Sequence, residues 1–541
     1  FLTDIYDVIA TETVINHYNT SPVKGKSYEI ISFIYISYDI YIWVDLMVKT
    51  LNLYSLTIAV IIFSVIIASS FTSILHAQGK PSVFEIVLDR DISDEDIKVI
   101  SNLGGRIIYR FDEFRGLAIY LSNERINNLK TSLKGIKSIS EAGIVKPLGE
   151  ALPSKCLEHG ANFTWNLDMI NVSVVHEELG YNGSGVYIAI LDTGLEPHWR
   201  NYFSEDSIDT EHAAAFLGAM ATSYLVTNKE LNRNAWEADK DGHGMAVTSV
   251  ILGYKVYNLY VIDGVAPNAK IIPVKVIGNQ GWGFTSDVVA GIYYITKLYE
   301  DEIASEGNTL YPPGIVNPII ISLSLGGPPS PLMKEVIDYS ISKGVFVVAA
   351  AGNEGDKGMS YPGAYEEVIS VGAVGWVDQF KMSGWWRLSD VPENPDELRG
   401  QVYIPNFSSR ALEGQDLDVL SPGVWVVAPY TAYGTAHPPL WANGKPGQYY
   451  YVSGTSMAAP HVSGILALIL QADILKDNKL DINQPIAEQL LESSTINISE
   501  GSAEVNVPTG GTEIHVWGSN AVGNGLVIAD KAVREVLNNS G

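Results

Sequence analysis

Five continuous apolar runs alternate with helix-length segments in the part of the chain that follows residue 165. The runs are VYIAIL, AKIIPVKVI, NPIIISLSLG, GVFVVAAAG and EVISVGAV, and the segments between them include SDVVAGIYYITKLYE and PLMKEVIDYSISKG. A strand that is apolar at every position is buried on both faces, which is typical of a parallel sheet covered by helices on each side. The pattern predicts a three-layer α/β domain with a mostly parallel central sheet over residues 161–541.

A smaller unit precedes this domain, over residues 82–140. The strand-like SVFEIVL is followed by an acidic helix with spaced isoleucines over 91–103, which two glycines end. Two alternating strands, RIIYRF and GLAIYL, a second helix near 123–133 and the strand GIKSIS complete the order β-α-β-β-α-β. That order predicts a small α+β, ferredoxin-like fold, which on its own indicates no function. Residues 141–160 are interpreted as a linker.

One long apolar run without a charge lies at residues 53–75. The segment 47–77 has the cationic start, apolar core and small terminal residue of a cleaved export signal. A run of about 20 apolar residues is also long enough to stay in a bilayer as an anchor. Both alternatives make the rest of the chain extracellular or cell-surface, and residues 1–46 are interpreted as an upstream leader.

The acidic composition excludes one class of partner. Lys and Arg number 35 against 61 Asp and Glu, which gives a formal net charge of −26. Such a surface repels phosphate backbones and anionic lipid head groups. We therefore expect no nucleic-acid partner, and contact with a membrane only through residues 53–75. Cys156 is the single cysteine, so no disulfide can form within the chain.

Three polar residues stand at the ends of predicted elements. Asp192 ends the buried strand of GVYIAILDTG, His243 lies between two glycines in DKDGHGMAVTSV, and Ser456 begins the helix of SGTSMAAPHVSGILALIL. A serine hydroxyl is a weak nucleophile, neutral imidazole can accept its proton near pH 7, and a carboxylate orients the imidazole. Each residue taken alone could instead cap a turn or a helix. In this order and on this strand–helix pattern, the three predict a nucleophilic serine site.

The segments LDTG, DGHG and GTSMAAPHVSG resemble the signature motifs of the subtilisin-like serine proteases, the subtilase family (peptidase family S8). The resemblance implies that Asp192, His243 and Ser456 form the catalytic triad. It also implies that the amide of Asn353 joins the Ser456 backbone N–H in an oxyanion hole. An esterase of the α/β-hydrolase type is excluded, because its serine lies in G-x-S-x-G and its triad follows a different order.

Two edge segments that bind extended substrate through backbone groups are also implied by the resemblance. The first consists of Ser324, Leu325 and Gly326, and the second of Ala350, Ala351 and Gly352. Ser360 stands where relatives line the pocket for the residue before the scissile bond, but no preference for that residue follows from the sequence.

The resemblance gives the small unit over 82–140 a role. Its pattern and position are similar to the family's N-terminal propeptide, an intramolecular inhibitor and folding chaperone that is removed by self-cleavage, here expected within 138–160. We therefore expect a monomeric serine endopeptidase that acts on proteins or peptides and is made as a self-processed zymogen. The alternative is a binding protein that kept the subtilase fold and lost catalysis.

The remaining expectations concern cofactors and departures from the family. No cofactor is expected for catalysis, and a structural Ca²⁺ is implied by the resemblance alone, with carboxylates of 204–209 and 237–241 as candidate ligands. Met245-Ala246 stand where the family has Thr-His, so we expect altered helix packing with the chemistry unchanged. The long segments 204–238, 298–317, 377–404 and 430–449 are interpreted as surface insertions or, alternatively, as rims around bound substrate.

Overall fold

The structure is a computed structural model that describes residues 81–152, 164–218, 235–256, 260–303, 316–380, 391–392, 394–430, 449–508 and 510–538. All of them belong to one compact unit, Pro81–Gly541. The predictions for 1–46 and 47–77 lie outside the described residues, as do Cys156 and parts of each of the four long segments.

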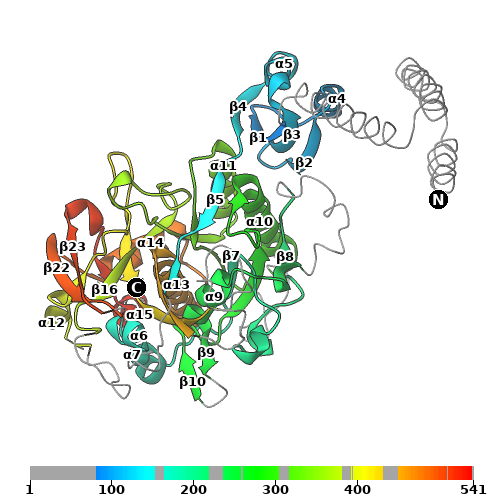
Figure 1. Cartoon of the computed structure of the whole chain (residues 1–541). Coiled ribbons are helices and arrows are strands. Elements are labelled where there is room, and N and C mark those ends of the chain that lie inside the picture. Colours follow the sequence, from blue (N-terminus) through cyan, green and yellow to red (C-terminus); the bar gives the residue numbers. More distant parts are fainter. Residues whose placement is uncertain are drawn as a thin grey trace, which may run out of the picture. The chain divides into compact units, whose positions relative to one another are not determined.

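An antiparallel sheet with two helices forms the first part of the described chain (Figure 1). Its elements are β1 (Pro81–Leu88), α4 (Asp94–Asn102), β2 (Arg106–Phe111), β3 (Gly116–Ser122), α5 (Ile126–Ser132) and β4 (Ile136–Glu141). The strand order is β2-β3-β1-β4, and every neighbouring pair is antiparallel. Ile86 and Leu117 of the sheet bury a shared core with Ile100 of α4 and Leu129 of α5. The predicted ferredoxin-like arrangement is confirmed.

The central sheet of the second part is mostly parallel, as the apolar runs predict. Its strands in the described residues are β7 (Tyr187–Asp192), β8 (Ala214–Ala215), β11 (Lys270–Lys275), β13 (Ile319–Leu323), β15 (Phe346–Ala350), β16 (Ile369–Trp376), β17 (Val402–Tyr403), β18 (Val419–Pro422), β21 (Thr495–Ile496) and β24 (Leu526–Val527). The order is β21-β24-β18-β16-β15-β13-β7-β11-β8, with β17 paired to β16. Only the pairs β21–β24 and β16–β17 are antiparallel among these described strands.

Helices cover both faces of this sheet. They are α9 (His243–Leu252), α10 (Thr285–Leu298), α11 (Pro331–Ser342), α13 (Thr455–Asp477), α14 (Gln484–Ser493) and α15 (Ala529–Asn538). Ile188 and Ile190 of β7 pack in the cluster that contains α9 and α13, whereas Ala189 and Leu191 pack in the cluster that contains α10 and α11. Alternate residues of one strand therefore face opposite layers, and the three-layer prediction is confirmed.

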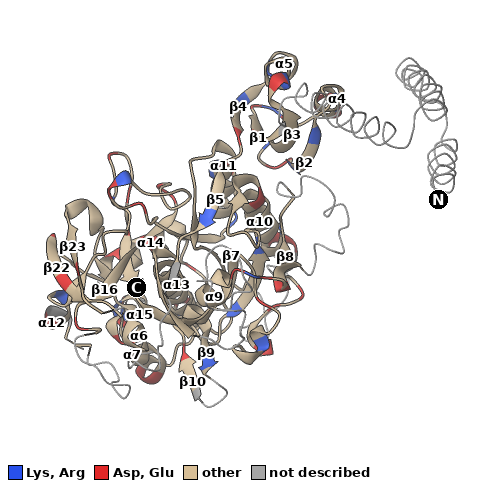
Figure 2. Ribbon diagram, in the orientation of Figure 1, with Lys and Arg blue, Asp and Glu red and all other residues tan. Residues whose placement is uncertain are grey.

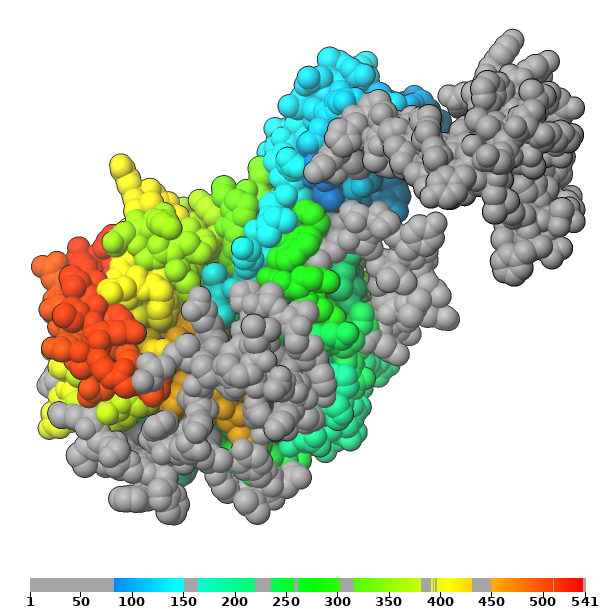
Figure 3. Space-filling view, in the orientation of Figure 1, coloured from blue at the N-terminus to red at the C-terminus, as the bar shows by residue number. Residues whose placement is uncertain are grey.

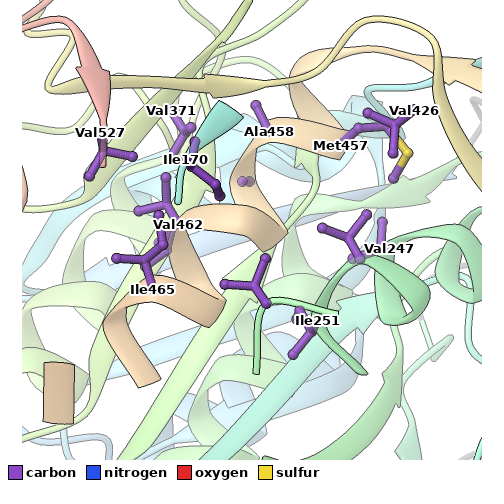
Figure 4. Packing of buried hydrophobic residues seen from close by; sticks show 14 of the residues in the cluster. Ile170, Val247, Ile251, Val371, Val426, Met457, Ala458, Val462, Ile465 and Val527 are labelled. Atoms are coloured by element: carbon purple, nitrogen blue, oxygen red, sulfur yellow. The ribbon is translucent and has the colours of Figure 1, made fainter. Parts of the chain in front are cut away.

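The helix α13 runs through the interior, where it packs against α9 and the sheet. Figure 4 shows Met457, Val462 and Ile465 of α13 close to Val247 and Ile251 of α9. Among the described residues α13 is the one helix that is long and apolar enough to cross a membrane, but 94% of its apolar window is buried inside the domain. It is therefore a core helix.

Several short elements lie outside the central sheet. They are β5 (Ile144–Pro147), β6 (Glu150–Leu152), α6 (Trp165–Met169), α7 (Val172–Val174), β9 (Gly253–Val256), β10 (Tyr260–Asp263), β12 (Gly283–Phe284), β14 (Leu325–Gly326), α12 (Pro395–Arg399), β19 (Val426–Pro429), β20 (Tyr449–Ser453), β22 (Gly501–Asn506) and β23 (Thr512–Trp517). Two three-stranded sheets, β12-β5-β14 and β19-β20-β6, join the linker to the second part of the chain.

Residues of both charge signs are distributed along the described chain. In the ribbon of Figure 2, positions of Lys and Arg are interspersed with positions of Asp and Glu.

Candidate active site

Three residues from distant parts of the chain meet at one end of the central sheet. His243 is the first residue of α9, Asp192 ends β7 and Ser456 is the second residue of α13. His243 Nδ1 lies 2.9 Å from both carboxylate oxygens of Asp192, and His243 Nε2 lies 3.0 Å from Ser456 Oγ. All three side chains are buried. The structure thus brings together the three residues that the sequence singles out for nucleophilic chemistry.

Glycines let the two segments that carry Asp192 and His243 approach each other. A Cβ added at Gly244 would lie 2.2 Å from the carbonyl oxygen of Gly194, much closer than real Cβ contacts. Gly194 itself has φ +92°, a conformation that L side chains rarely adopt. The glycines of the LDTG and DGHG motifs therefore serve the contact between the two loops.

The charge state of His243 is set by its carboxylate neighbours. Burial pushes the pKa of His243 down, but the Asp192 carboxylate, with further negative charge from Asp241 and Asp239, raises it overall. The second buried histidine of these motifs, His461, shows the contrast. Burial lowers the pKa of His461 to about 4, and its Nδ1 contacts the carbonyl oxygen of Met457 at 2.7 Å. Of these two histidines, only His243 is arranged to accept and hold a proton near neutral pH.

Two donors converge on a single carbonyl oxygen beside Ser456. Asn353 Nδ2 donates to the oxygen of Leu148 at 2.6 Å, and the backbone N–H of Ser456 donates to the same oxygen at 3.2 Å. The amide of Asn353 is held because its Oδ1 accepts bonds of 2.9 Å from both the N–H and the hydroxyl of Thr455. A Cβ at Gly454 would lie 2.0 Å from the Leu148 oxygen, so this position requires glycine.

Leu148 lies in the short connection between β5, which is labelled in Figure 1, and β6. On one side of Leu148, β5 pairs antiparallel with both β14 and β12, and the Leu148 N–H donates to the Ser324 carbonyl at 3.2 Å. On the other side, β6 pairs antiparallel with β20. In the space-filling view of Figure 3 this cyan segment leads from the first part of the chain onto the second.

The peptide bond after Leu148 faces the serine and the imidazole. A Cβ added at Gly149 would lie 2.6 Å from Ser456 Oγ and 2.9 Å from His243 Nε2. The side chain of Leu148 points to Gly326, where an added Cβ would lie 2.9 Å from Leu148 Cδ1 and 2.7 Å from Ser360 Cβ. Gly326 and Ser360 thus leave space for an apolar side chain at this position.

The two predicted edge segments have different places in the structure. Leu325 and Gly326 pair with Pro147 and Lys146, so the first segment borders β5. The second segment, 350–352, bonds elsewhere: the Ala351 N–H donates to Val371, and the Gly352 N–H donates to the Thr455 hydroxyl at 3.2 Å. The second strand that pairs with β5 is β12, which sequence reasoning missed. Its signal in the sequence is weak, since GWGF is only a glycine-rich stretch before a helix.

Two of the carboxylates that the sequence suggests as calcium ligands have protein partners. Glu237 already accepts bonds from Trp199 Nε1 at 2.9 Å and Arg200 Nη1 at 2.6 Å, and Asp209 contacts His212 Nδ1 at 2.8 Å. Among the described residues, one group has carboxylate oxygens within 4.8 Å of one another, and it consists of Asp418, Glu488 and Glu492.

Two of these carboxyl groups have strongly shifted pKa values. Burial, with the nearby Glu488, raises the pKa of Asp418 to about 8, against the hydrogen bonds from Ser370. Burial and the charge of Glu492 raise the pKa of Glu488 to about 7. The oxygen Oδ1 of Asp418 is buried without a hydrogen-bond partner. The raised pKa values mean that these crowded carboxyl groups resist simultaneous ionisation near neutral pH.

Met245 and Ala246 are fully buried in the core that α9 shares with α13. Their side chains fill the interface between these helices with apolar atoms. The departure from the family at these positions is thus a packing feature of the interior.

Hydrolases that use an activated serine typically align it with an imidazole and a carboxylate. They also place two N–H donors beside the serine. The model of the subtilase family matches residues 183–502 of the chain. The chain belongs to the subtilase family of serine endopeptidases.

Similar curated proteins include subtilisins and alkaline proteases. Subtilisin E of Bacillus subtilis (strain 168) is 27% identical over 377 residues, which cover 69% of this chain and 74% of that protein. M-protease of Shouchella clausii (strain KSM-K16) is 25% identical over 447 residues, which cover 82% of this chain and 86% of that protein.

A similar solved structure is fervidolysin from Fervidobacterium pennivorans, a keratinolytic enzyme related to subtilisin. The TM-score is 0.57 at 20% sequence identity, and the match covers 84% of this chain and 61% of that chain. At this identity the likeness supports the fold alone.

Proposed function

We propose that the chain is a serine endopeptidase precursor that acts through Ser456, His243 and Asp192, and that its first substrate is its own Leu148–Gly149 bond. The observation that carries the proposal is the position of the Leu148 carbonyl oxygen. It accepts hydrogen bonds from Asn353 Nδ2 and the Ser456 N–H, the two donors that would stabilise negative charge on a reacting carbonyl.

The chemistry proceeds in two steps. Ser456 Oγ attacks the Leu148 carbonyl carbon while His243 Nε2 takes the hydroxyl proton, and Asp192 stabilises the imidazolium. His243 then gives the proton to the nitrogen of Gly149, the peptide bond breaks, and Leu148 stays on Ser456 as an ester. Water, deprotonated by His243, hydrolyses the ester and restores the serine. The products are a Leu148 carboxylate and a Gly149 amine, and no cofactor takes part.

Contacts between residues 81–141 and the peptidase domain support an inhibitory role for the first part of the chain. The buried carboxylate of Glu85 accepts hydrogen bonds from the hydroxyls of Thr285 and Ser330, at the first turn of α10 and the N-cap of α11. Tyr109 donates to Asp287 at 2.8 Å. In the proposal this part holds β5 in the substrate position until cleavage, and afterwards leaves as an inhibitor.

The proposal includes export and a monomeric enzyme that acts on extended polypeptides. Export rests on the sequence of segment 47–77, which lies outside the described residues. Recognition of extended polypeptides is supported by the pairing of β5 with two strands, because backbone pairing accepts many side chains.

A structural Ca²⁺ fits Asp418, Glu488 and Glu492. Ligand oxygens around Ca²⁺ lie about 2.3–2.6 Å from the ion, so two of them lie up to about 5 Å apart. The unpartnered Oδ1 of Asp418 supplies a buried ligand, and the ion would neutralise the crowded carboxylates.

In Ser456→Ala protein, Ca²⁺ should raise the melting temperature, and Glu488→Gln should abolish the rise. Glu413→Gln, at an exposed acid, is the matched control. A rise that persists in Glu488→Gln contradicts this site.

The catalytic proposal is tested with a fluorophosphonate probe on the processed protein. We expect covalent labelling of Ser456 and hydrolysis of peptide substrates, with both lost in Ser456→Ala. The alternative is a binding protein without catalysis. It predicts a folded and processed chain that neither labels nor hydrolyses peptides.

A further inference from the structure

Two buried, oppositely charged residues lie beside the contact between Asp192 and His243. Asp239 is 1% exposed and Lys275 is 2% exposed. Burial of a charge is costly unless the group is paired and hydrogen-bonded. The reaction steps described above use neither residue, so the two charges need another explanation.

The carboxylate of Asp239 binds the backbone just before His243 and the hydroxyl of Thr193. Its Oδ2 accepts from the N–H of Gly242 at 3.0 Å and from the hydroxyl of Thr193 at 2.8 Å. Its Oδ1 accepts from the N–H of Asp241 at 2.8 Å. An ionised carboxylate only accepts hydrogen bonds, so its two oxygens match these three donors.

Thr193 extends this connection to both catalytic segments. It is the residue after Asp192, and its hydroxyl also accepts from the N–H of Gly244 at 2.9 Å. Because Gly242 and Gly244 flank His243, the neighbours of the base and of its carboxylate partner share one bonded group. A shift of Asp239 would therefore change the position of Asp192 relative to His243.

Lys275 fixes the same loop from the neighbouring strand. It ends β11 and is paired in register with Asp192 of β7. Its Nζ donates to the carbonyl oxygen of Thr193 and, at 3.0 Å, to Asn279 Oδ1. The same Asn279 oxygen accepts from the Lys240 N–H at 3.3 Å, so Lys275 also anchors the loop that carries Asp239.

The negative charge of Asp239 also acts on His243 through space, where it raises the pKa of His243. Burial raises the pKa of Asp239 to about 7, opposed by the nearby Lys275. Burial lowers the pKa of Lys275, opposed by the three surrounding aspartates. Asp239 and Lys275 thus favour each other's charged form.

We propose that Asp239 and Lys275 are positioning residues that hold Thr193 and thereby the Asp192–His243 pair. The inference rests on the proposed role of His243 as the base.

The test compares Asp239→Asn with Lys275→Met, which keeps the aliphatic stem. Each substitution removes a contact that holds the segment of Thr193, so kcat should fall about tenfold with KM unchanged. Asp473→Asn, at a buried carboxyl near the end of α13, is the matched control and should leave kcat unchanged. An unchanged kcat in both variants, or a change in KM alone, overturns the proposal.

A second measurement does not depend on activity or processing. The ring signals of His243 are compared by NMR in Ser456→Ala protein with and without each substitution, and they should change in both variants because the ring moves relative to Asp192. If wild-type Ser456 neither labels nor hydrolyses, the proposed function fails, whereas the NMR comparison still tests the positioning role. Thr193→Val should lower kcat about tenfold with KM unchanged, and Thr193→Ser should restore it. Equal loss in both variants contradicts the positioning role of the hydroxyl.

Discussion

The side-chain amide of Asn353 donates a 2.6 Å hydrogen bond to the carbonyl oxygen of Leu148, although 205 positions separate the two residues in the chain. This bond joins the linker after the small N-terminal fold to the centre of the peptidase domain. In the proposed reaction the Leu148 carbonyl is the group attacked, and Ser456 Oγ and His243 Nε2 lie beside the next residue, Gly149.

Loss of the Asn353 amide should slow self-cleavage without unfolding the precursor. Asn353→Ala removes one of the two donors to the Leu148 oxygen, so the first-order rate of cleavage should fall about 10²–10³-fold. Thr455→Val removes the hydroxyl that holds the Asn353 amide and should cause a smaller decrease. Cleavage is followed by gel electrophoresis after refolding. A rate within twofold of wild type in Asn353→Ala would mean that the amide does not stabilise the reacting oxygen.

Glycine at position 454 should be required for cleavage. In Gly454→Ala the new Cβ would lie 2.0 Å from the Leu148 oxygen, so the scissile carbonyl is displaced and the precursor should stay uncut. Gly149→Ala should slow cleavage for a related reason, because its Cβ would approach Ser456 Oγ. Gly400→Ala is the control, since the nearest atom to its Cβ is 3.8 Å away. Normal processing of Gly454→Ala would show that the linker reacts in a different position.

The buried contact of Glu85 should determine how long the cleaved first part stays bound. Glu85→Ala leaves the Thr285 and Ser330 hydroxyls without their shared acceptor, so activity should appear much sooner after self-cleavage. Lys137→Ala breaks an ion pair with Glu335 in which the Lys137 side chain is 59% exposed. Exposed pairs contribute little, so this variant should behave like wild type. The delay before peptide hydrolysis begins is the measurement, and equal delays in both variants would contradict the importance of Glu85.

The raised pKa of Asp418, about 8, predicts how stability depends on pH when Ca²⁺ is removed. The ordinary pKa of this group is 3.8, so the folded chain binds the Asp418 proton more tightly than the unfolded chain. The free energy of unfolding should therefore fall as the pH rises from about 4 to about 8. Asp418→Asn should reduce this fall by on the order of 1–3 kcal/mol.

Denaturant unfolding of Ser456→Ala protein in EDTA, at several pH values, measures this dependence. Asp356→Asn, at a 96% exposed carboxylate, serves as the control and should keep the wild-type slope. An unchanged slope in Asp418→Asn would show that other groups cause the pH dependence.

The fold could be predicted from the sequence because its signals are local. Each apolar run is a strand that both layers of helices bury, so its pattern is continuous and easy to recognise. The order of strands and helices in 82–140 is equally local, and the structure changes only the bounds, for example by starting α4 at Asp94 after the Ser93 cap. Short motifs at strand and helix ends likewise indicated which residues to consider for the site.

The partners of these residues could not be predicted, because they depend on how distant segments are aligned. The bond that faces Ser456 is fixed by the register of β5 on β14 and β12, and the sequence of 138–160 contains no sign of it. From the sequence, Asp239 is only one of the candidate cation ligands of 237–241, and Lys275 is a single charge within an apolar run. Only the fold shows that both are buried beside the catalytic pair.

The most direct test of the central claim is the amino-terminal sequence of the processed protein, measured together with its intact mass. Self-cleavage at the bond beside Ser456 predicts that the mature chain begins at Gly149 and that the released fragment ends at Leu148. It also predicts that Ser456→Ala stays a single chain. A mature chain that begins elsewhere without a Gly149 precursor, or cleavage that persists in Ser456→Ala, would contradict the claim.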